Sequence, residues 1–253
     1  MIGKNSIKEF YNNIYEKGDI RDNVRLYRWI VSLISAPPSS YLLDVGCGIG
    51  CLLYEASKRN IGVFGLDISY EALVKAKRTL PFIKVCVAYG EYIPFRDNSF
   101  GNVISLGSVE HFLDPETGIR EIARVLKSKG QAILLLPNSF YLGDILKVLF
   151  KGKTEEQWQI QERLLTKEQW RILIEKNGLI VKKIYGYNKY PELFQEGTFK
   201  IKSISKYIRT LLMRYLCPVN LSWQFIYVCK KPMINQENRL PAFGGIRHRR
   251  DRR

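Results

Sequence analysis

The chain has 253 residues, of which 46% are hydrophobic and 25% are charged, and its formal net charge is +16. This is the composition of a globular protein long enough to bury a full hydrophobic core. No apolar run approaches the ~20 residues that a membrane-spanning helix needs, and the N-terminal stretch MIGKNSIKEF lacks the pattern of a signal peptide.

The five cysteines form no CxxC pair and no regular disulfide pattern. We therefore expect reduced thiols in a cytoplasmic protein. The cysteines are Cys47, Cys51, Cys86, Cys217 and Cys229.

The positive charge is concentrated in the second part of the chain. Residues 141–253 carry 23 Lys and Arg against 10 Asp and Glu, whereas residues 1–140 carry 17 against 14. Such a bias favours an anionic partner: a membrane surface, RNA or a phosphorylated substrate. A solvated basic tail explains the charge equally well. Peripheral attachment to a membrane surface is therefore an open alternative to a purely cytoplasmic location.

Residues 22–35 have the pattern of an amphipathic helix that breaks at APPSS, where the residues before proline disfavour helix. We expect residues 1–36 to form an N-terminal helical cap.

Short apolar runs and helical segments then alternate up to about residue 138. The expected strands are 41–46, 62–68, 83–89, 102–107 and 131–136, and the expected helices are 51–60, 69–79 and 115–128. This alternation predicts an α/β fold with a doubly wound, Rossmann-like, mostly parallel sheet and helices on both faces.

The pattern loosens after this region. Residues 139–165 have the character of an insertion, and Thr166 then begins a helix within TKEQWRILIEKNG. The segments LIVKKIYGY and WQFIYVCKK predict two further strands, a C-terminal antiparallel pair that brings the sheet to seven. The main domain therefore spans residues 37–231.

Two segments near the C-terminus are strongly basic. Residues 191–222 mix Lys and Arg with apolar side chains, which suits a packing or lid helix and also a helix on a membrane surface. Residues 232–253 are expected to form a flexible basic tail.

The stretch YLLDVGCGIG, residues 41–50, joins the first strand to a glycine-rich loop. Its GxGxG spacing departs from the GxGxxG of dinucleotide sites, and no GKS or GKT is present for Walker-type phosphate binding. Asp44 stands two residues before the first glycine. A carboxylate there disfavours a pyrophosphate, which needs free N–H groups and a positive helix end, and it suits an ammonium group.

A second acidic residue, Asp67, ends the second expected strand. A carboxylate at this place can accept hydrogen bonds from both hydroxyls of a ribose. The two acids together predict a nucleoside ligand with an amino-acid arm.

In these segments the chain resembles the class I S-adenosylmethionine-dependent methyltransferases, of the type 11 methyltransferase-domain kind. The resemblance covers about residues 40–138 and lies in LLDVGCGIG, GLDIS, GEYIPFRDNSFGNVISLGSVEHF and REIARVLKSKGQAILLLPN, in matching order. It implies S-adenosyl-L-methionine as cofactor, with S-adenosyl-L-homocysteine as product.

The resemblance also implies the cofactor-binding residues. The methionine arm would lie on the loop segment that comprises Asp44, Gly46, Cys47, Gly48 and Gly50. Asp67 would hold the ribose and Ile68 would contact the adenine. Gly90 and Glu91 would border the adenine edge, and Leu106 would line the sulfonium side. Tyr89 stands where the family usually has an acidic residue.

The segment SVEHFLDPE contains the candidate catalytic residues Glu110 and His111. A histidine just past the fourth strand can act as a base near neutral pH. A similar pair binds a divalent metal in quinone-biosynthesis methyltransferases, but Gly107 occupies the place of their further carboxylate, so no metal is expected. The pair can equally serve to orient the loop that follows it.

The expected function is methyl transfer to oxygen or carbon of a small-molecule, lipid or glycan-precursor acceptor. An RNA (tRNA) methyltransferase that uses the basic C-terminal region is one alternative, and a non-catalytic cofactor-binding partner protein is another. The clamp (D/N)PP(Y/F), which marks methylation of exocyclic nitrogens, is missing after the fourth strand, where SLGS stands.

Overall fold

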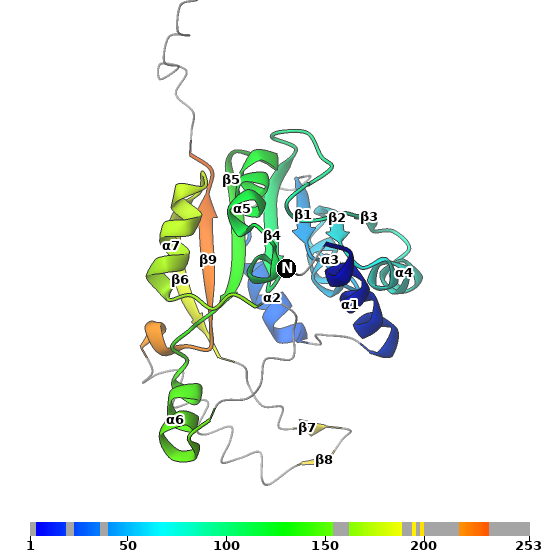
Figure 1. The fold of residues 1–253 in the computed structure, drawn as a ribbon. Coiled ribbons are helices and arrows are strands. Elements are labelled where there is room, and N and C mark those ends of the chain that lie inside the picture. Colours follow the sequence, from blue (N-terminus) through cyan, green and yellow to red (C-terminus); the bar gives the residue numbers. More distant parts are fainter. Residues whose placement is uncertain are drawn as a thin grey trace, which may run out of the picture.

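The computed structural model describes residues 4–18, 23–35, 40–153, 162–188, 194–195, 198–199 and 218–232. A seven-stranded sheet forms the centre of this part of the chain, in the order β3-β2-β1-β4-β5-β9-β6 (Figure 1). The strands are β1 (Tyr41–Val45), β2 (Gly62–Asp67), β3 (Lys84–Val87), β4 (Phe100–Leu106), β5 (Leu126–Pro137), β6 (Ile180–Tyr187) and β9 (Gln224–Lys230).

The first five strands are parallel, and β9 runs antiparallel between β5 and β6. This confirms the predicted doubly wound, mostly parallel sheet with an antiparallel strand near the C-terminus. Two short strands, β7 (Phe194–Gln195) and β8 (Thr198–Phe199), pair with each other outside this sheet.

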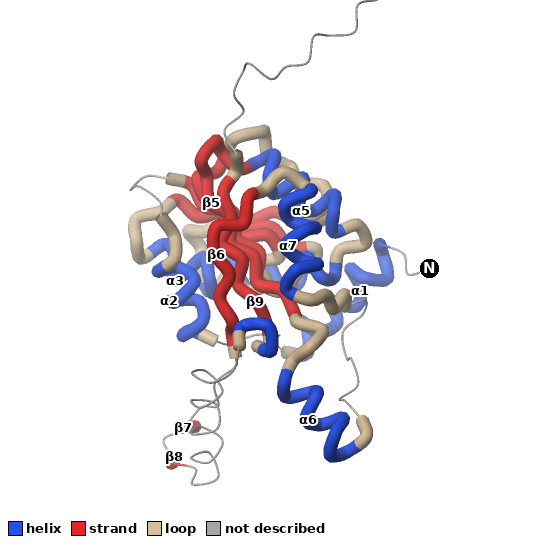
Figure 2. The backbone as a smooth tube through the Cα atoms, turned by 90° about the vertical axis from the view of Figure 1, so that its left-hand side faces the viewer, coloured by secondary structure: helices blue, strands red, loops and turns tan. Residues whose placement is uncertain are grey.

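Helices cover both faces of the sheet, with α2 and α3 on one side and α5 and α7 on the other (Figure 2). The helices are α1 (Lys4–Lys17), α2 (Val24–Ser32), α3 (Cys51–Ser57), α4 (Tyr70–Thr79), α5 (Pro115–Val125), α6 (Leu142–Lys151) and α7 (Lys167–Lys176). Two 3₁₀ turns, η1 (Val109–His111) and η2 (Val219–Leu221), complete the list. None of the described helices is long and apolar enough to cross a bilayer.

Alternation along the central strands explains the two layers. In β1, Leu42 packs with α2, α3 and α4, whereas Leu43 and Val45 pack with α5 and α7. All three side chains are completely buried. Successive residues of a strand point to opposite faces, so a central parallel strand must be apolar on both.

The helix ends follow local sequence signals. Ser69 accepts a hydrogen bond from Ala72 N at the start of α4, and Thr166 and Gln169 form a reciprocal capping box at the start of α7. The prediction for residues 115–128 was too long: α5 ends at Val125, because Leu126 is extended and pairs with Phe100 of β4.

The N-terminal region differs from the prediction because it contains a second helix. Two helices, not one, precede the sheet: α2 lies within the expected segment, and α1 was not predicted. The insertion of residues 139–165 contains α6. Of the basic segment 191–222 only two short strands and residues 218–222 lie among the described residues, and the expected tail lies outside them from residue 233 onward.

Candidate active site

A cleft opens at the carboxyl ends of β1, β2 and β4, the edge at which open parallel sheets bind their ligands. Its walls come from the glycine loop, the residues after β3 and β4, and the N-terminal helix α1. The space between the lining atoms is about 1140 Å³, including the open mouth. Clefts of this order of size bind small molecules in proteins.

The glycine loop takes a backbone path that side chains would block. Gly46 and Gly48 have φ angles of +78° and +51°, in the left-handed region. A Cβ atom on Gly46 would lie 2.1 Å from Ser108 Oγ, and one on Gly48 would lie 2.6 Å from Tyr15 Oη. Both glycines line the cleft, whereas Gly50 caps α3 with φ +82° and does not reach it.

Two buried carboxylates, the candidate acids of the sequence, flank this loop. Asp44 and Asp67 line the cleft and are only 3% and 6% exposed. Asp67 accepts hydrogen bonds from Gly48 N through Oδ2 and from Ser69 N through Oδ1, both at 2.8 Å. Each carboxylate oxygen can accept a further hydrogen bond, so Asp67 can hold the loop and still receive ribose hydroxyls.

Burial raises the pKa of Asp67, and the hydrogen bonds from the backbone N–H groups of Ser69, Gly48 and Ile68 oppose this rise. Cys47, between the two acids, is also buried, and desolvation together with the charges of Asp67 and Asp44 holds its pKa well above the ordinary value. The Cys47 thiol is therefore protonated at neutral pH and is not a nucleophile. It lines the cleft as a packing side chain.

The residues predicted to contact the adenine and the sulfonium line the same cleft. Two of them, Gly90 and Glu91, also pack or hydrogen-bond with the segment after β4. Ile68 and Leu106 lie at the ends of β2 and β4. A Cβ on Gly90 would lie 2.1 Å from the Phe112 ring, so only glycine allows this packing. Glu91 is buried and accepts a hydrogen bond of 2.9 Å from Leu113 N. This contact ties the segment after β3 to the segment after β4.

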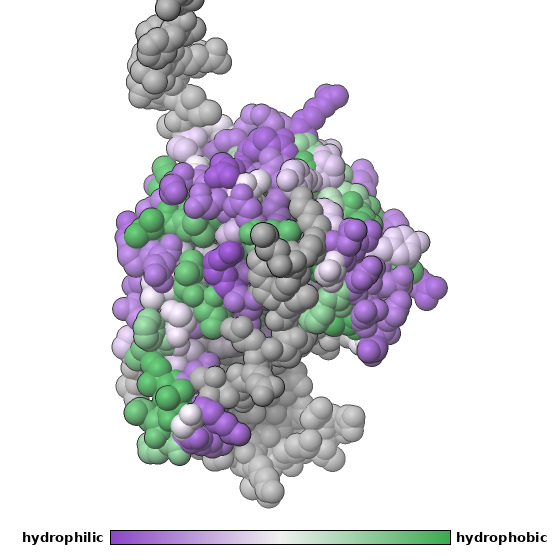
Figure 3. Space-filling view, viewed as in Figure 1, coloured by the Kyte–Doolittle hydropathy of each residue, from purple (hydrophilic) through white to green (hydrophobic). Residues whose placement is uncertain are grey.

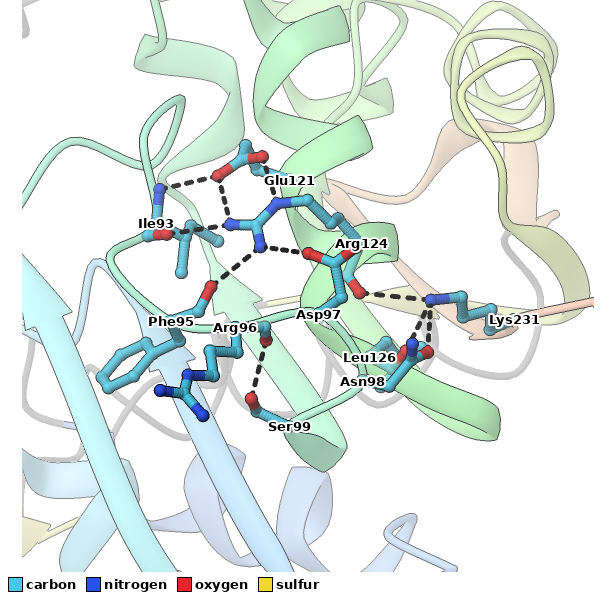
Figure 4. Close-up of polar contacts among 10 residues, drawn as sticks. All are labelled: Ile93, Phe95, Arg96, Asp97, Asn98, Ser99, Glu121, Arg124, Leu126 and Lys231. Carbon is cyan, nitrogen blue, oxygen red and sulfur yellow. Dashed lines mark hydrogen bonds and ion pairs between the residues drawn. The ribbon is translucent and has the colours of Figure 1, made fainter.

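The segment between β3 and β4, which contains Gly90 and Glu91, is fixed by hydrogen bonds to side chains of α5. Arg124 donates to Ile93 O at 2.9 Å and to Phe95 O at 2.8 Å, and it pairs with Asp97 and Glu121 (Figure 4). Glu121 also accepts a hydrogen bond of 2.9 Å from Ile93 N. The hydrogen bonds and charge of Arg124 lower the pKa of Glu121.

Of the two candidate catalytic residues, one lines the cleft and the other is buried outside its lining. His111 is 7% exposed and lines the cleft, whereas Glu110 is 1% exposed and does not line it. His111 Nε2 lies 3.9 Å from Glu110 Oε1. The Tyr11 ring lies edge-on to the His111 ring, with centroids 6.1 Å apart.

No group of three or more His, Cys, Asp or Glu side chains that could hold a metal ion occurs within the described ranges of the chain.

Several lining residues were not predicted. Ile7, Tyr11 and Tyr15 come from α1, which lies across the cleft, and Ser108 and Phe112 come from η1 and its flanks. Ile7, Tyr11 and Tyr15 stand at positions i, i+4 and i+8 of α1. This helical periodicity could have indicated a buried face. Asn12 of the same helix accepts a hydrogen bond from Ser69 Oγ at 2.8 Å.

A doubly wound sheet with a glycine loop and two buried acids at its carboxyl edge defines a nucleoside-binding α/β protein. The sequence profile of the family described as "Methyltransferase domain" matches residues 43–134. Residues 43–134 therefore match a methyltransferase domain, of the class whose cofactor is S-adenosylmethionine.

Curated relatives resemble the same part of the chain. An uncharacterised protein of Methanocaldococcus jannaschii, MJ1252, is 31% identical over 59% of this chain and 59% of its own length. The ubiquinone/menaquinone biosynthesis C-methyltransferase UbiE of Geotalea daltonii is 28% identical over 51% of this chain and 62% of its own. A Bacillus subtilis protein, YxjB, assigned as a 23S rRNA (guanine-N(1)-)-methyltransferase, is 32% identical over 49% and 45%.

A solved structure shares the fold over nearly the whole chain. Magnesium protoporphyrin IX methyltransferase from Synechocystis, with bound S-adenosylhomocysteine, superposes with a TM-score of 0.64 at 13% identity, covering 90% of this chain and 100% of its own. The chain spans about half to three fifths of the length of the three curated relatives named above.

Proposed function

We propose that the protein transfers the methyl group of S-adenosylmethionine to a carbon or oxygen of a small, largely apolar ring compound of the phenol or hydroquinone type. The observation that carries this proposal is the part of the cleft wall formed by α1 and η1. There the His111 imidazole lies against the Tyr11 ring, and Ile7 of α1 also lines the cleft. Aromatic and apolar walls with one titratable group suit a flat ring that bears a hydroxyl.

The residues of the cleft fit the cofactor. Buried Asp44 suits its ammonium group, Asp67 suits the ribose hydroxyls, and the glycines leave room for close approach of the methionine arm. When bound, S-adenosylmethionine supplies an electrophilic methyl group on a positively charged sulfur. The protein's own contribution is to place the acceptor in line and to exclude water.

His111 is the residue in the cleft suited to accept a proton from the acceptor hydroxyl. The carboxylate of Glu110, 3.9 Å from His111 Nε2, stabilises the imidazolium that this step forms. Glu110 is thus a positioning residue behind the base. Carbonyl O of Glu110 also accepts a hydrogen bond of 3.0 Å from Arg163 N, which ties the pair to the segment after α6.

The relatives offer two acceptor classes. The Geotalea daltonii protein is named as a C-methyltransferase of ubiquinone and menaquinone biosynthesis, which agrees with a ring acceptor. The Bacillus subtilis relative is named for an rRNA base, and the net charge of residues 141–253 is compatible with RNA. We favour the ring acceptor because aromatic and apolar side chains, Tyr11 and Ile7, line the cleft with His111.

The test offers both classes to the full chain. The protein is incubated with S-adenosylmethionine that carries a deuterated methyl group, together with either a panel of 1,4-hydroquinones with and without isoprenoid tails or a 23S rRNA transcript. Mass spectrometry should find one labelled methyl group on a hydroquinone and none on the RNA. His111→Ala should lower turnover and leave cofactor affinity unchanged. Label on RNA alone would contradict the proposal.

A further inference from the structure

Helix α6 exposes apolar side chains in a way that no other part of the described chain does. None of its residues is buried, and Phe150 and Leu149 are 83% and 71% exposed. Leu146, Val148 and the preceding Phe140 are exposed as well. Figure 3 shows the resulting apolar surface at the lower left of the molecule, over α6. Exposed apolar patches of this kind mark interaction surfaces.

Most of the exposed apolar residues share one side of the helix. Leu146, Leu149 and Phe150, together with the half-buried Leu142, recur at the i, i+4, i+7 and i+8 positions that form a single stripe. The other side carries Asp144, Lys147 and Lys151, and also Val148.

The side of the helix opposite the stripe is basic. Residues 142–153 contain three lysines, at 147, 151 and 153, against the single carboxylate of Asp144, which pairs with Lys147 at 3.1 Å. An apolar stripe with lysines on the opposite side is the pattern of a helix that lies in a lipid interface.

The helix leaves the body of the protein at the edge where the cleft opens. Leu106 of β4, which lines the cleft, pairs with Leu135 of β5, and β5 ends two residues later at Pro137. The chain then enters α6 at Leu142. Figures 1 and 2 both show α6 projecting away from the sheet and the other helices.

We propose that α6 docks the protein on an anionic lipid bilayer, with its apolar stripe in the headgroup region and its lysines against the lipid phosphates. The opposite charge of lysines and anionic lipid gives the docking its electrostatic part. A second copy of the chain fits the surface less well. The four side chains of the stripe offer less than the roughly 800 Å² per partner that a stable dimer interface buries. The proposal does not depend on which acceptor is methylated.

The experiment measures binding of the full chain to phosphatidylcholine vesicles with and without phosphatidylglycerol, by flotation. The wild-type protein should float with the anionic vesicles, and the double variant Leu149→Ser, Phe150→Ser should bind them about tenfold or more weakly. Ile172→Ser is the matched control. Ile172 is a 57% exposed apolar residue on α7, away from the stripe, and its removal should leave binding unchanged.

A second measurement does not need the variants. Vesicles should slow amide hydrogen exchange in residues 142–151 of the wild-type protein and leave α7 unaffected. Equal binding by the double variant, equal binding to neutral and anionic vesicles, or the absence of wild-type binding would each overturn the proposal. So would a wild-type dimer in solution that the double variant abolishes, because it would assign the stripe to a second copy.

Discussion

At the scale of single residues, Gly46 shows how closely the loop is packed. Its φ is +78°, and a Cβ there would overlap Ser108 Oγ. We expect Gly46→Ala to weaken S-adenosylmethionine binding at least about tenfold, roughly 1.4 kcal/mol, because both the strained backbone and the displaced Ser108 reshape the cleft. Isothermal titration calorimetry measures the change.

The matched control is Gly101→Ala. Gly101 lies in β4, has no positive φ, and its added Cβ would come no closer than 3.4 Å to Ser40. Cofactor affinity should be unchanged in this variant. If Gly46→Ala bound as tightly as the wild type, the loop would not be the cofactor cradle.

Asp67 gives the cofactor site a pH dependence. Its ionised form accepts hydrogen bonds from Gly48 and Ser69, and burial raises its pKa above the ordinary aspartate value. Its carboxylate is therefore protonated at a higher pH than that of an exposed aspartate, so cofactor affinity should fall on acidification starting above the usual aspartate range. Calorimetry over a pH series checks this. Asp67→Asn should bind weakly at every pH, and an equally steep pH profile in that variant would assign the titration to another group.

At the scale of secondary-structure elements, the contact between α5 and the β3–β4 connection supports the cleft. Glu121 joins Arg124 to Ile93 N and is only 19% exposed. Glu121→Gln should lower the free energy of unfolding by about 1–3 kcal/mol, since it replaces hydrogen bonds to a charged group. Glu168→Gln, in the exposed pair with Arg171 on α7, should change it by no more than about 0.5 kcal/mol.

The stabilisation from the Glu121–Arg124 contact should depend on pH. The pKa of Glu121 is lowered in the folded protein by Arg124, so its stabilisation is complete above the unfolded pKa, near 4.3, and is lost as the pH falls through the folded value. Urea unfolding at neutral and acidic pH should show the wild type and Glu121→Gln converging in acid. A constant difference between them would contradict this assignment.

At the scale of the whole molecule, the cofactor should couple α1 to the sheet. Ile7 and Tyr15 of α1 are buried against the cleft, and Asn12 bonds Ser69 at the start of α4. S-adenosylhomocysteine at 100 times its Kd should raise the free energy of unfolding by about 2.7 kcal/mol. It should also slow amide exchange in α1 together with the glycine loop. Slowing in the loop alone would show that α1 does not close on the cofactor.

The parallel sheet and the glycine-loop wall of the cleft could be predicted because their signals are local. Apolar strands, the capping residues Ser69 and Thr166, and the glycine loop each act within a few residues of their own position. Helix α1 was missed because its 14 residues are mostly polar and its apolar stripe becomes meaningful only when the cleft lies beneath it.

The sequence by itself therefore determined the fold class, the cofactor and the two acids that flank the loop, since strand periodicity and short-range spacing encode them. Only the tertiary structure showed that Ser108 excludes a side chain at Gly46 and that Phe112 excludes one at Gly90. It also showed that α1 lies across the cleft. It also decided that α6 projects with its apolar stripe exposed. These features depend on contacts, or on missing contacts, between segments far apart in the chain, and local sequence patterns do not record them.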